Sequence, residues 1–296
     1  MSFTLRIFTR ARRRKAFKVG VAVVGVLTVI AVLAPYIAPY PLEGYGYVDE
    51  RTLLRGCQPP SFAHPLGTDH MGRDVLSRVL LATRTALLQV SLVICLSLLI
   101  GITIGVLAAY FKGIVDTVLN YFIELFMAIP TIIVALLLRM STGLGLHVVI
   151  VSLVLVWWAW YARIAYVYAK SIVEMEYVVL AKLSGLSSFR ILGRHVIRNL
   201  LQPMLVQAIS DMGSVLLEAS AINFLGLGLP PGSPDWGVML YEAVSNYAVE
   251  LFRVAPWLGV TPGALILTTT LGFSLIADSL REELDPRLRR RWKLWF

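Results

Sequence analysis

Residues 86–111, ALLQVSLVICLSLLIGITIGVLAAYF, decide the fold. This stretch carries no charged side chain, and it exceeds the roughly 20 residues that a helix needs to cross a hydrocarbon core about 30 Å thick. The whole chain of 296 residues has the same character, because 57% of it is hydrophobic, only 15% is charged and its mean hydropathy is +0.74. Soluble domains average about 25% charged residues. The sequence therefore indicates a membrane protein and excludes disorder, coiled coils and nearly all soluble enzymes.

Other apolar stretches on both sides of this one predict an all-α polytopic protein with six transmembrane helices. The expected spans cover residues 19–38, 86–111, 117–138, 144–162, 203–229 and 256–277. The first span is interpreted as a retained anchor, because its apolar run is longer than that of a signal peptide. Pro130 is expected to kink the third span. Gly101 and Gly105 form a GxxxG pair that suits close helix packing.

The positions of the basic residues predict the orientation. Most of the 27 Lys and Arg residues lie in segments 1–18, 112–116, 163–202 and 278–296, which favours cytoplasmic N- and C-termini. The basic N-terminus is therefore interpreted as a retention signal and not as a nucleic-acid-binding segment. The resulting organisation is a basic tail with the first span (1–38), an extracytoplasmic segment (39–85), a five-helix core (86–280) and a cytoplasmic tail (281–296).

The segments outside the spans have distinct patterns. Residues 40–65 are rich in Pro, Gly and Tyr and predict an irregular loop. Apolar residues at helical spacing within 72–84 predict an amphipathic helix lying on the outer surface, with Val75, Leu76, Val79 and Leu80 on one side. The outer stretch GLGLPPGSPDWG, residues 226–237, excludes regular structure because of its prolines and glycines.

The inner loop 163–202 is too organised for a simple connector. Residues 171–183 predict a helix, Gly185 breaks it, and Ser187 or Ser188 can cap a second helix that runs toward the fifth span. The expected arrangement is a helix, a glycine turn and a helix on the inner side of the membrane.

Several kinds of chemistry are missing from the sequence. No GxxxxGK[ST] motif is present, so no P-loop is expected, and the four histidines lack the spacing of an HExxH-type metal site. The two cysteines exclude a disulfide scaffold. We expect no cofactor, no metal and no catalytic residue in this chain.

Three carboxylates fall within expected spans: Glu124, Asp211 and Glu218. A carboxylate in the middle of a bilayer costs roughly 2.5–3.5 kcal/mol even on a lenient scale, so such groups face a cavity or a partner. Both interpretations stay open from the sequence: these residues line a pathway, or they form polar contacts between packed helices.

The inner loop carries the first specific motif. Residues 176–199, EYVVLAKLSGLSSFRILGRHVIRN, resemble the cytoplasmic motif of ABC-importer permeases, with Leu180 and Arg198 standing where Ala and Pro are usual. The residues that match the motif, and that the resemblance assigns to the coupling loop for an ATPase, are Glu176, Tyr177, Ala181, Gly185, Ile191, Arg194, His195 and Asn199; Val178 also matches.

Two outer motifs point to the same family. His64 to Arg78, HPLGTDHMGRDVLSR, is similar to the segment before the second span of dipeptide, oligopeptide and nickel permeases, and residues 224–237 are similar to the segment after their fifth span. The motif residues singled out on the outer face are Gly67, Thr68, Asp69, Gly72, Arg73, Asp74, Gly226, Gly228, Pro231, Trp236 and Gly237.

The resemblance implies a type I ABC-importer permease fold and the C-type member of a permease pair. It further implies a sister permease, two cytoplasmic ATPases that hydrolyse the ATP, an extracytoplasmic substrate-binding protein and a cell-membrane location. The cargo would be a dipeptide, an oligopeptide, a nickel chelate or an oligosaccharide. The alternatives are a stand-alone secondary transporter or channel, which predicts an internal repeat that we do not find, and an intramembrane enzyme, which lacks a nucleophile–base pair.

Overall fold

The computed structural model describes residues 14–284, and within them the fold is all-α, as expected. No β-strand occurs in this range; the one β-type pairing is an isolated bridge between Thr68 and Asp74. Among residues 14–284, five helices are long and apolar enough to cross a membrane: α2 (Lys15–Ile37), α5 (Val75–Phe111), α8 (Leu146–Val173), α11 (Arg198–Phe224, continuous with the shorter segments before it) and α14 (Pro256–Leu284).

The expected third span is broken rather than gently kinked. It consists of α6 (Gly113–Met127) and α7 (Thr131–Thr142), which are bent by 82° at a break of a few residues. Pro130 is the residue before α7 and has extended dihedral angles, so the helix restarts after it. If this bent pair counts as one span, the described part of the chain has six candidate spans, in agreement with the prediction from hydropathy.

The expectation of a separate surface helix over residues 72–84 is wrong. Helix α5 begins at Val75, where the Asp74 side chain accepts the backbone N–H of Ser77 at 2.7 Å, and it runs without a break to Phe111. Both sides of its first turns are buried: Val75 is 0% and Arg78 is 1% exposed. The polar side of these turns does not face water, because Arg78 pairs with carboxylates inside the protein. The amphipathic pattern of residues 72–84 therefore reflects a buried charge cluster and not a surface helix.

The connections are more helical than the sequence suggested. Segment 39–85, which the sequence analysis expects outside the membrane, contains the short helices α3 (Pro41–Gly44) and α4 (Glu50–Arg55). The outer connection is irregular through Asp235, as expected, and then forms α12 (Trp236–Tyr247), a 3-10 turn (Ala248–Glu250) and α13 (Leu251–Val254). Asp235 caps α12 by accepting the backbone N–H groups of Gly237 and Val238.

The inner loop has the expected order of elements with different bounds. Helix α8 continues beyond the expected span end to Val173, and α9 begins only at Glu176 and ends at Leu183. After Gly185, α10 (Ser188–Ile191) passes through a π-helical turn (Leu192–Ile197) directly into α11. The second helix of the loop is therefore the beginning of the fifth span.

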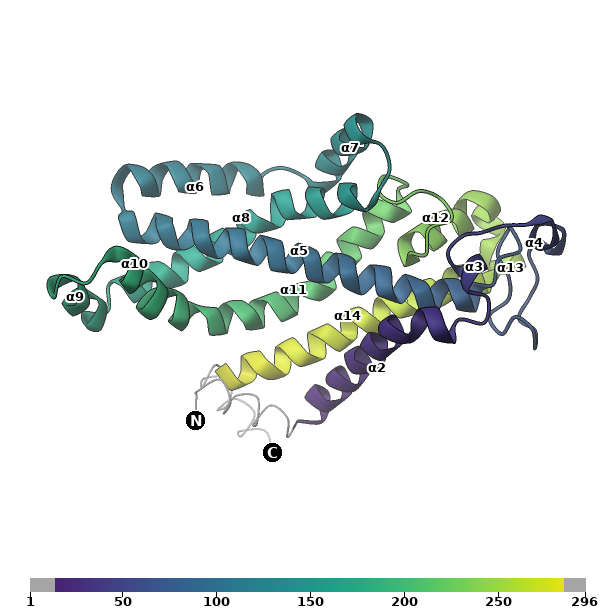
Figure 1. The fold of residues 1–296 in the computed structure, drawn as a ribbon, viewed down its shortest axis with the longest axis horizontal. Helices are drawn as coiled ribbons and strands as arrows, with labels where there is room; N and C mark the ends of the chain where they lie inside the picture. The colour runs from purple at the N-terminus through teal and green to yellow at the C-terminus, as the bar shows by residue number, and fades with distance from the viewer. Residues whose placement is uncertain (1–13, 285–296) are drawn as a thin grey trace.

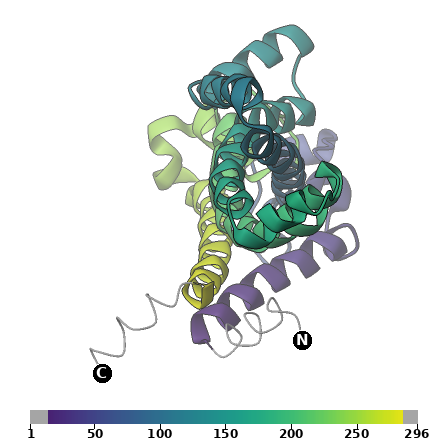
Figure 2. The same ribbon diagram turned by 90° about the vertical axis from the view of Figure 1, so that its left-hand side faces the viewer.

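The long helices run roughly parallel to the longest axis of the molecule (Figure 1). Helices α9 and α10 lie at one end, and α3, α4, α12 and α13 lie at the other. We call these the α9 end and the α12 end. Helices α2 and α14 pack against each other, and the turned view shows them meeting at the ends nearest the viewer (Figure 2). Arg14, the residue before α2, donates a hydrogen bond to Glu283 of α14 at 3.2 Å. Both described chain ends therefore meet near one another.

Helices α5 and α8 pack closely because two glycines of α5 lie against the α8 backbone. A Cβ added to Gly101 would lie 2.7 Å from the carbonyl oxygen of Trp158, and one added to Gly105 would lie 2.3 Å from that of Ala162. Real Cβ atoms do not approach a backbone oxygen so closely. The GxxxG pair thus fixes the distance between the two helices at the centre of the bundle.

We predict that Gly105→Ala destabilises the protein by about 1–3 kcal/mol, because the added methyl group forces α5 and α8 apart. The control is Gly25→Ala in α2, where an added Cβ meets nothing within 4 Å. Thermal unfolding of the detergent-solubilised variants measures the difference. Equal melting temperatures for the two variants would contradict the packing role.

Candidate functional site

Four buried charged side chains form a network at the α12 end. The Asp69 carboxylate accepts hydrogen bonds from Arg73 at 2.7 Å and Arg78 at 2.6 Å. The same two arginines donate to Glu242 of α12 at 3.1 and 2.7 Å. Each of the four residues is at most 6% exposed. Two guanidinium groups and two carboxylates thus neutralise one another, which is the condition under which buried charges are tolerated.

Further hydrogen bonds connect this charge network to the surrounding segments. Glu43 accepts Arg55 at 3.1 Å and the backbone N–H of Asp74 at 2.8 Å. Gly232, in the loop before α12, donates its N–H to Glu242 at 2.7 Å. The network therefore joins the segment before α5, the start of α5, the proline-rich loop and α12 into one scaffold.

The pKa values agree with this pairing. Burial alone would raise the pKa of Asp69, but Arg78 and Arg73 outweigh it and hold that pKa below its ordinary value. The pKa of Glu242 is lowered by the same two arginines against the same effect of burial. The two arginines therefore favour the ionised form of both carboxylates.

The glycines of the outer motifs allow backbone segments to touch. Gly72 has φ +77°, and an added Cβ would lie 1.8 Å from the carbonyl oxygen of Thr52. A Cβ added to Gly237 would lie 2.4 Å from the Ser220 carbonyl oxygen, and one added to Gly228 would lie 2.1 Å from the Asn223 side-chain oxygen. The remaining outer motif residues have related positions: Gly67 and Gly226 adopt φ +73° and +68°, Thr68 and Trp236 are 0% exposed, and Pro231 is exposed.

Asp69, His70 and Glu242 offer ligand atoms within 4.8 Å of one another, which is a geometry that a metal ion could use. Both carboxylates already accept arginine, however, and a divalent cation would have to compete with two fixed positive charges. This chemistry favours a scaffold of ion pairs over a metal site.

The three carboxylates predicted within the spans lie in different surroundings. Glu124 on α6 is largely exposed and lies 3.7 Å from Arg163. Asp211 on α11 is 7% exposed and accepts Gln207 at 2.7 Å and the indole N–H of Trp160 at 3.3 Å. Glu218, two turns further along α11, accepts the indole N–H of Trp157 at 3.0 Å and the Thr131 hydroxyl at 3.4 Å. Asp211 and Glu218 thus share one face of α11, and Glu124 is apart from them.

The glycine turn of the inner loop has the conformation that the sequence predicted. Gly185 has φ +77°, its N–H bonds the carbonyl of Lys182, and the N–H of Leu186 bonds that of Ala181 at 3.2 Å. These two bonds are the Schellman arrangement that ends a helix at glycine. An added Cβ at Gly185 meets nothing within 4 Å, so its backbone angle alone requires glycine.

The coupling-loop residues divide into two groups. Ala181 and Ile191 are buried within this chain, so the small size of Ala181 lets α9 pack closely against its own neighbours. Tyr177 accepts the Asn199 amide at 3.0 Å, and its ring lies 6.0 Å from that of His195. The exposed members are Glu176, Tyr177, Gly185, Arg194 and Asn199, and His195 is half-buried.

An exposed apolar surface covers the outside of α9 and α10. Its largest members are Leu180, Leu183 and Phe189, which are 61%, 79% and 89% exposed. We call these three residues the α9 patch. Sequence reasoning missed it because the motif pointed to the small and polar residues, although Leu180 was recognised as a departure from the usual alanine.

A bundle of membrane-crossing helices with a rigid scaffold at one end and an organised helix–glycine–helix loop at the other defines a polytopic membrane permease. Residues 101–290 match the family described as "Binding-protein-dependent transport system inner membrane component", and residues 2–60 match "N-terminal TM domain of oligopeptide transport permease C". The chain therefore belongs to the permease family of binding-protein-dependent ABC importers.

Several relatives align over nearly the whole chain. The dipeptide transport system permease protein DppC of Alkalihalophilus pseudofirmus is 30% identical over 95% of this chain and 89% of its own length. A putative peptide transport system permease protein of Brucella suis is 33% identical over 95% of this chain and 90% of its own. The nickel transport system permease protein NikC of Escherichia coli is 32% identical over 93% of this chain and 95% of its own.

We predict that Glu242→Gln lowers the stability of the purified protein by about 3–5 kcal/mol, because it leaves two buried arginines with the single carboxylate of Asp69. Glu174→Gln is the matched control, since Glu174 forms an exposed pair with Lys112 at 3.9 Å. Thermal unfolding of both variants measures the effect. A melting temperature for Glu242→Gln no lower than that of the control would show that the network is dispensable.

Proposed function

We propose that this chain is one permease of a peptide importer, in which it lines the translocation path with a sister permease. Two cytoplasmic ATPases hydrolyse the ATP, and an extracytoplasmic binding protein delivers the cargo; the chain itself catalyses no reaction. The family supports the transport role, and the dipeptide and putative peptide permeases among the relatives support a di- or oligopeptide cargo.

The observation that carries the coupling role is the α9 patch. Large apolar side chains that stay exposed at the end of a bundle mark a protein-binding surface. The patch belongs to a short helix held by a glycine turn, so it presents a defined shape to a partner. An ATPase that binds this patch could displace α9 when the ATPase changes its conformation.

The contacts behind the patch supply the route by which motion would spread. Tyr177 of α9 bonds Asn199 at the start of α11, and α10 continues into the same helix. Lys182 lies 4.3 Å from the centre of the Tyr110 ring at the inner end of α5, and the Tyr110 hydroxyl bonds Ser188 at 3.1 Å. A displacement of α9 would therefore act on α5 and α11 together, and alternating access would follow from the movement of these two helices.

The expected orientation places the α9 end in the cytoplasm and the α12 end outside, with both termini cytoplasmic. The distribution of Lys and Arg supports it. The charge network is consistent with this orientation. Unpaired arginines favour the cytoplasmic side, but Arg73 and Arg78 are neutralised by Asp69 and Glu242, so their presence outside weakens the prediction less.

Gly185→Val tests the coupling role. A β-branched residue at φ +77° costs on the order of 1–3 kcal/mol of strain, so the α9 patch should shift while the spans stay intact. We expect a complex that reaches the membrane, loses most transport and no longer raises its ATPase activity with loaded binding protein. Glu176→Lys, which reverses an exposed charge on the same helix, should act similarly.

The control for that experiment is Gly193→Val. Gly193 lies in the same loop, an added Cβ there meets nothing within 4 Å, and its backbone is helical. It should retain nearly normal transport and stimulated ATPase activity. Normal transport by both Gly185→Val and Glu176→Lys would mean that the loop is a mere connector.

Cysteine labelling tests the orientation. In a variant with Cys57 and Cys95 replaced by Ser, Phe62→Cys should react with a membrane-impermeant maleimide in intact cells, because Phe62 is fully exposed and lies in segment 39–85, which the proposed orientation places outside. A cysteine at the exposed Ser184, beside α9, should react only after permeabilisation. The reverse pattern would overturn the proposed topology.

A further inference from the structure

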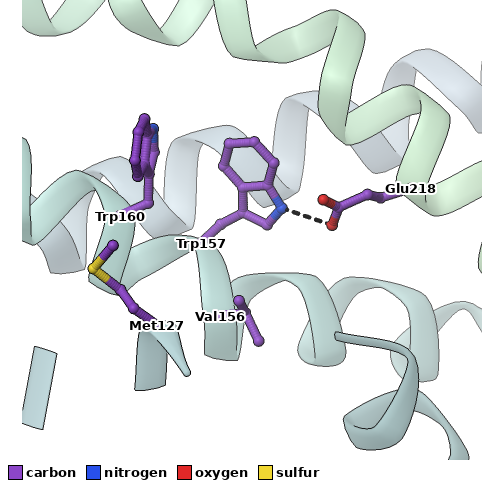
Figure 3. Close-up of a pocket in the computed structure, with 5 residues that line it drawn as sticks. All are labelled: Met127, Val156, Trp157, Trp160 and Glu218. Atoms are coloured by element: carbon purple, nitrogen blue, oxygen red, sulfur yellow. Dashed lines mark hydrogen bonds between the residues drawn. The ribbon is translucent and has the colours of Figure 1, made fainter. Parts of the chain in front are cut away.

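A pocket of about 290 Å³ lies between the broken span and the helices α8 and α11. Its walls are Met127, Val156, Trp157, Trp160 and Glu218, of which Glu218 is the sole charged member (Figure 3). Met127 is the last residue of α6, and Thr131, which bonds Glu218, is the first of α7. The pocket is therefore built at the break of a discontinuous helix, where transporters commonly place substrate sites.

The Glu218 carboxylate has unused acceptor capacity toward this pocket. Both of its donors, the Trp157 indole and the Thr131 hydroxyl, bond the same oxygen, Oε2. Within residues 14–284, Oε1 accepts no hydrogen bond, and no Lys, Arg or His lies within 4.0 Å of the carboxylate. A carboxylate can accept about four hydrogen bonds, so one oxygen is left for a donor that enters from outside the chain.

The aromatic walls favour a positively charged donor. Trp157 and Trp160 are one helical turn apart on α8, and Figure 3 shows both indoles on the pocket side with Glu218 beyond Trp157. Asp211 fixes the Trp160 ring by accepting its N–H at 3.3 Å. Indole faces attract ammonium groups, and the attraction strengthens away from water. A carboxylate oxygen next to two fixed indoles is thus complementary to an alkylammonium ion.

Asp211 is the less suitable anion, although it lies on the same face of α11. It already accepts Gln207 and Trp160, and Gln207 is in turn bound by Arg281 at 2.9 Å. Glu218 receives two neutral donors and no nearby cation. The difference in partners assigns the ligand-binding role to Glu218 and a positioning role to Asp211.

We propose that this pocket binds an ammonium group of the cargo during translocation, with Glu218 as the anion and Trp157 and Trp160 as the aromatic walls. The proposal rests on the proposed peptide transport and names the part of the peptide that this chain recognises. The α-ammonium group of a peptide and the ammonium group of a lysine side chain share the required chemistry.

The competing explanation is a structural latch, in which Glu218 only holds α7 through Thr131. Glu218→Gln separates the two, because the amide oxygen can still accept from Trp157 and Thr131 while the charge is lost. Glu218→Asp retains the charge with a shorter reach. Asp278→Asn, at an exposed site of α14, controls for loss of a carboxylate elsewhere in a spanning helix.

The experiment measures uptake into proteoliposomes that contain the complete importer, with peptides first shown to bind its binding protein. The probes are trialanine, N-acetyl-Ala-Lys-Ala and N-acetyl-trialanine, which carry an α-ammonium group, a side-chain ammonium group and no ammonium group. We expect Glu218→Gln to lower kcat/KM about tenfold for the ammonium-bearing probes and hardly for N-acetyl-trialanine. Glu218→Asp should recover part of the loss, and Asp278→Asn should resemble the wild type.

The outcomes separate the two proposals. A lower kcat/KM of Glu218→Gln for trialanine alone means that the site binds the α-ammonium group. A lower kcat/KM for both ammonium-bearing probes means that the site accepts an ammonium group from the α-position and from a lysine side chain. An equal loss for all three probes, or no loss for any, overturns the pocket proposal. Absence of uptake by the wild-type importer for every probe would instead overturn the proposed peptide transport.

Discussion

The structure depends most on the mutual neutralisation of Asp69, Arg73, Arg78 and Glu242 beside the first turn of α5. Four charges buried without partners would oppose folding strongly, whereas in this arrangement each guanidinium meets both carboxylates. The network also decides the shape of α5, because its paired polar residues can enter the protein and the helix can begin at Val75. The proline-rich loop and α12 are positioned by the same charges.

A second constraint, the contact of Gly101 and Gly105 with α8, carries this rigidity along the bundle. Helices α5 and α8 cannot slide apart or rotate freely when backbone touches backbone. The backbone irregularities lie elsewhere, at the break between α6 and α7 and at the π-helical turn before α11. The pocket at Glu218 lies beside the first of these irregularities, and the α9 patch lies beside the second.

Hydropathy predicted the all-α fold and the spans, because those features depend on local composition, whereas Pro130 predicted only a kink at the place where the structure has an 82° break. The glycine turn at Gly185 was predictable for the same reason. The continuous start of α5 was not, since the pattern of residues 72–84 is amphipathic whether its polar side faces water or a distant carboxylate. Glu242 belongs to no motif that we recognised. The available signal was that two buried arginines, Arg73 and Arg78, need two carboxylates. Asp74 does not serve as the second one, because it caps α5 and pairs with His64. The pocket brings together residues from three separate spans, and no local pattern encodes such a meeting.

The sequence separation within the charge network has a consequence for biosynthesis. Arg73 and Arg78 precede Glu242 by 169 and 164 positions. At a synthesis rate of about 5–20 residues per second, on the order of ten to thirty seconds pass before the second carboxylate leaves the ribosome. During that interval the two arginines share Asp69 alone, and the α12 end remains incomplete. Closure of the scaffold is thus a late event of assembly, which follows the synthesis of the fifth span.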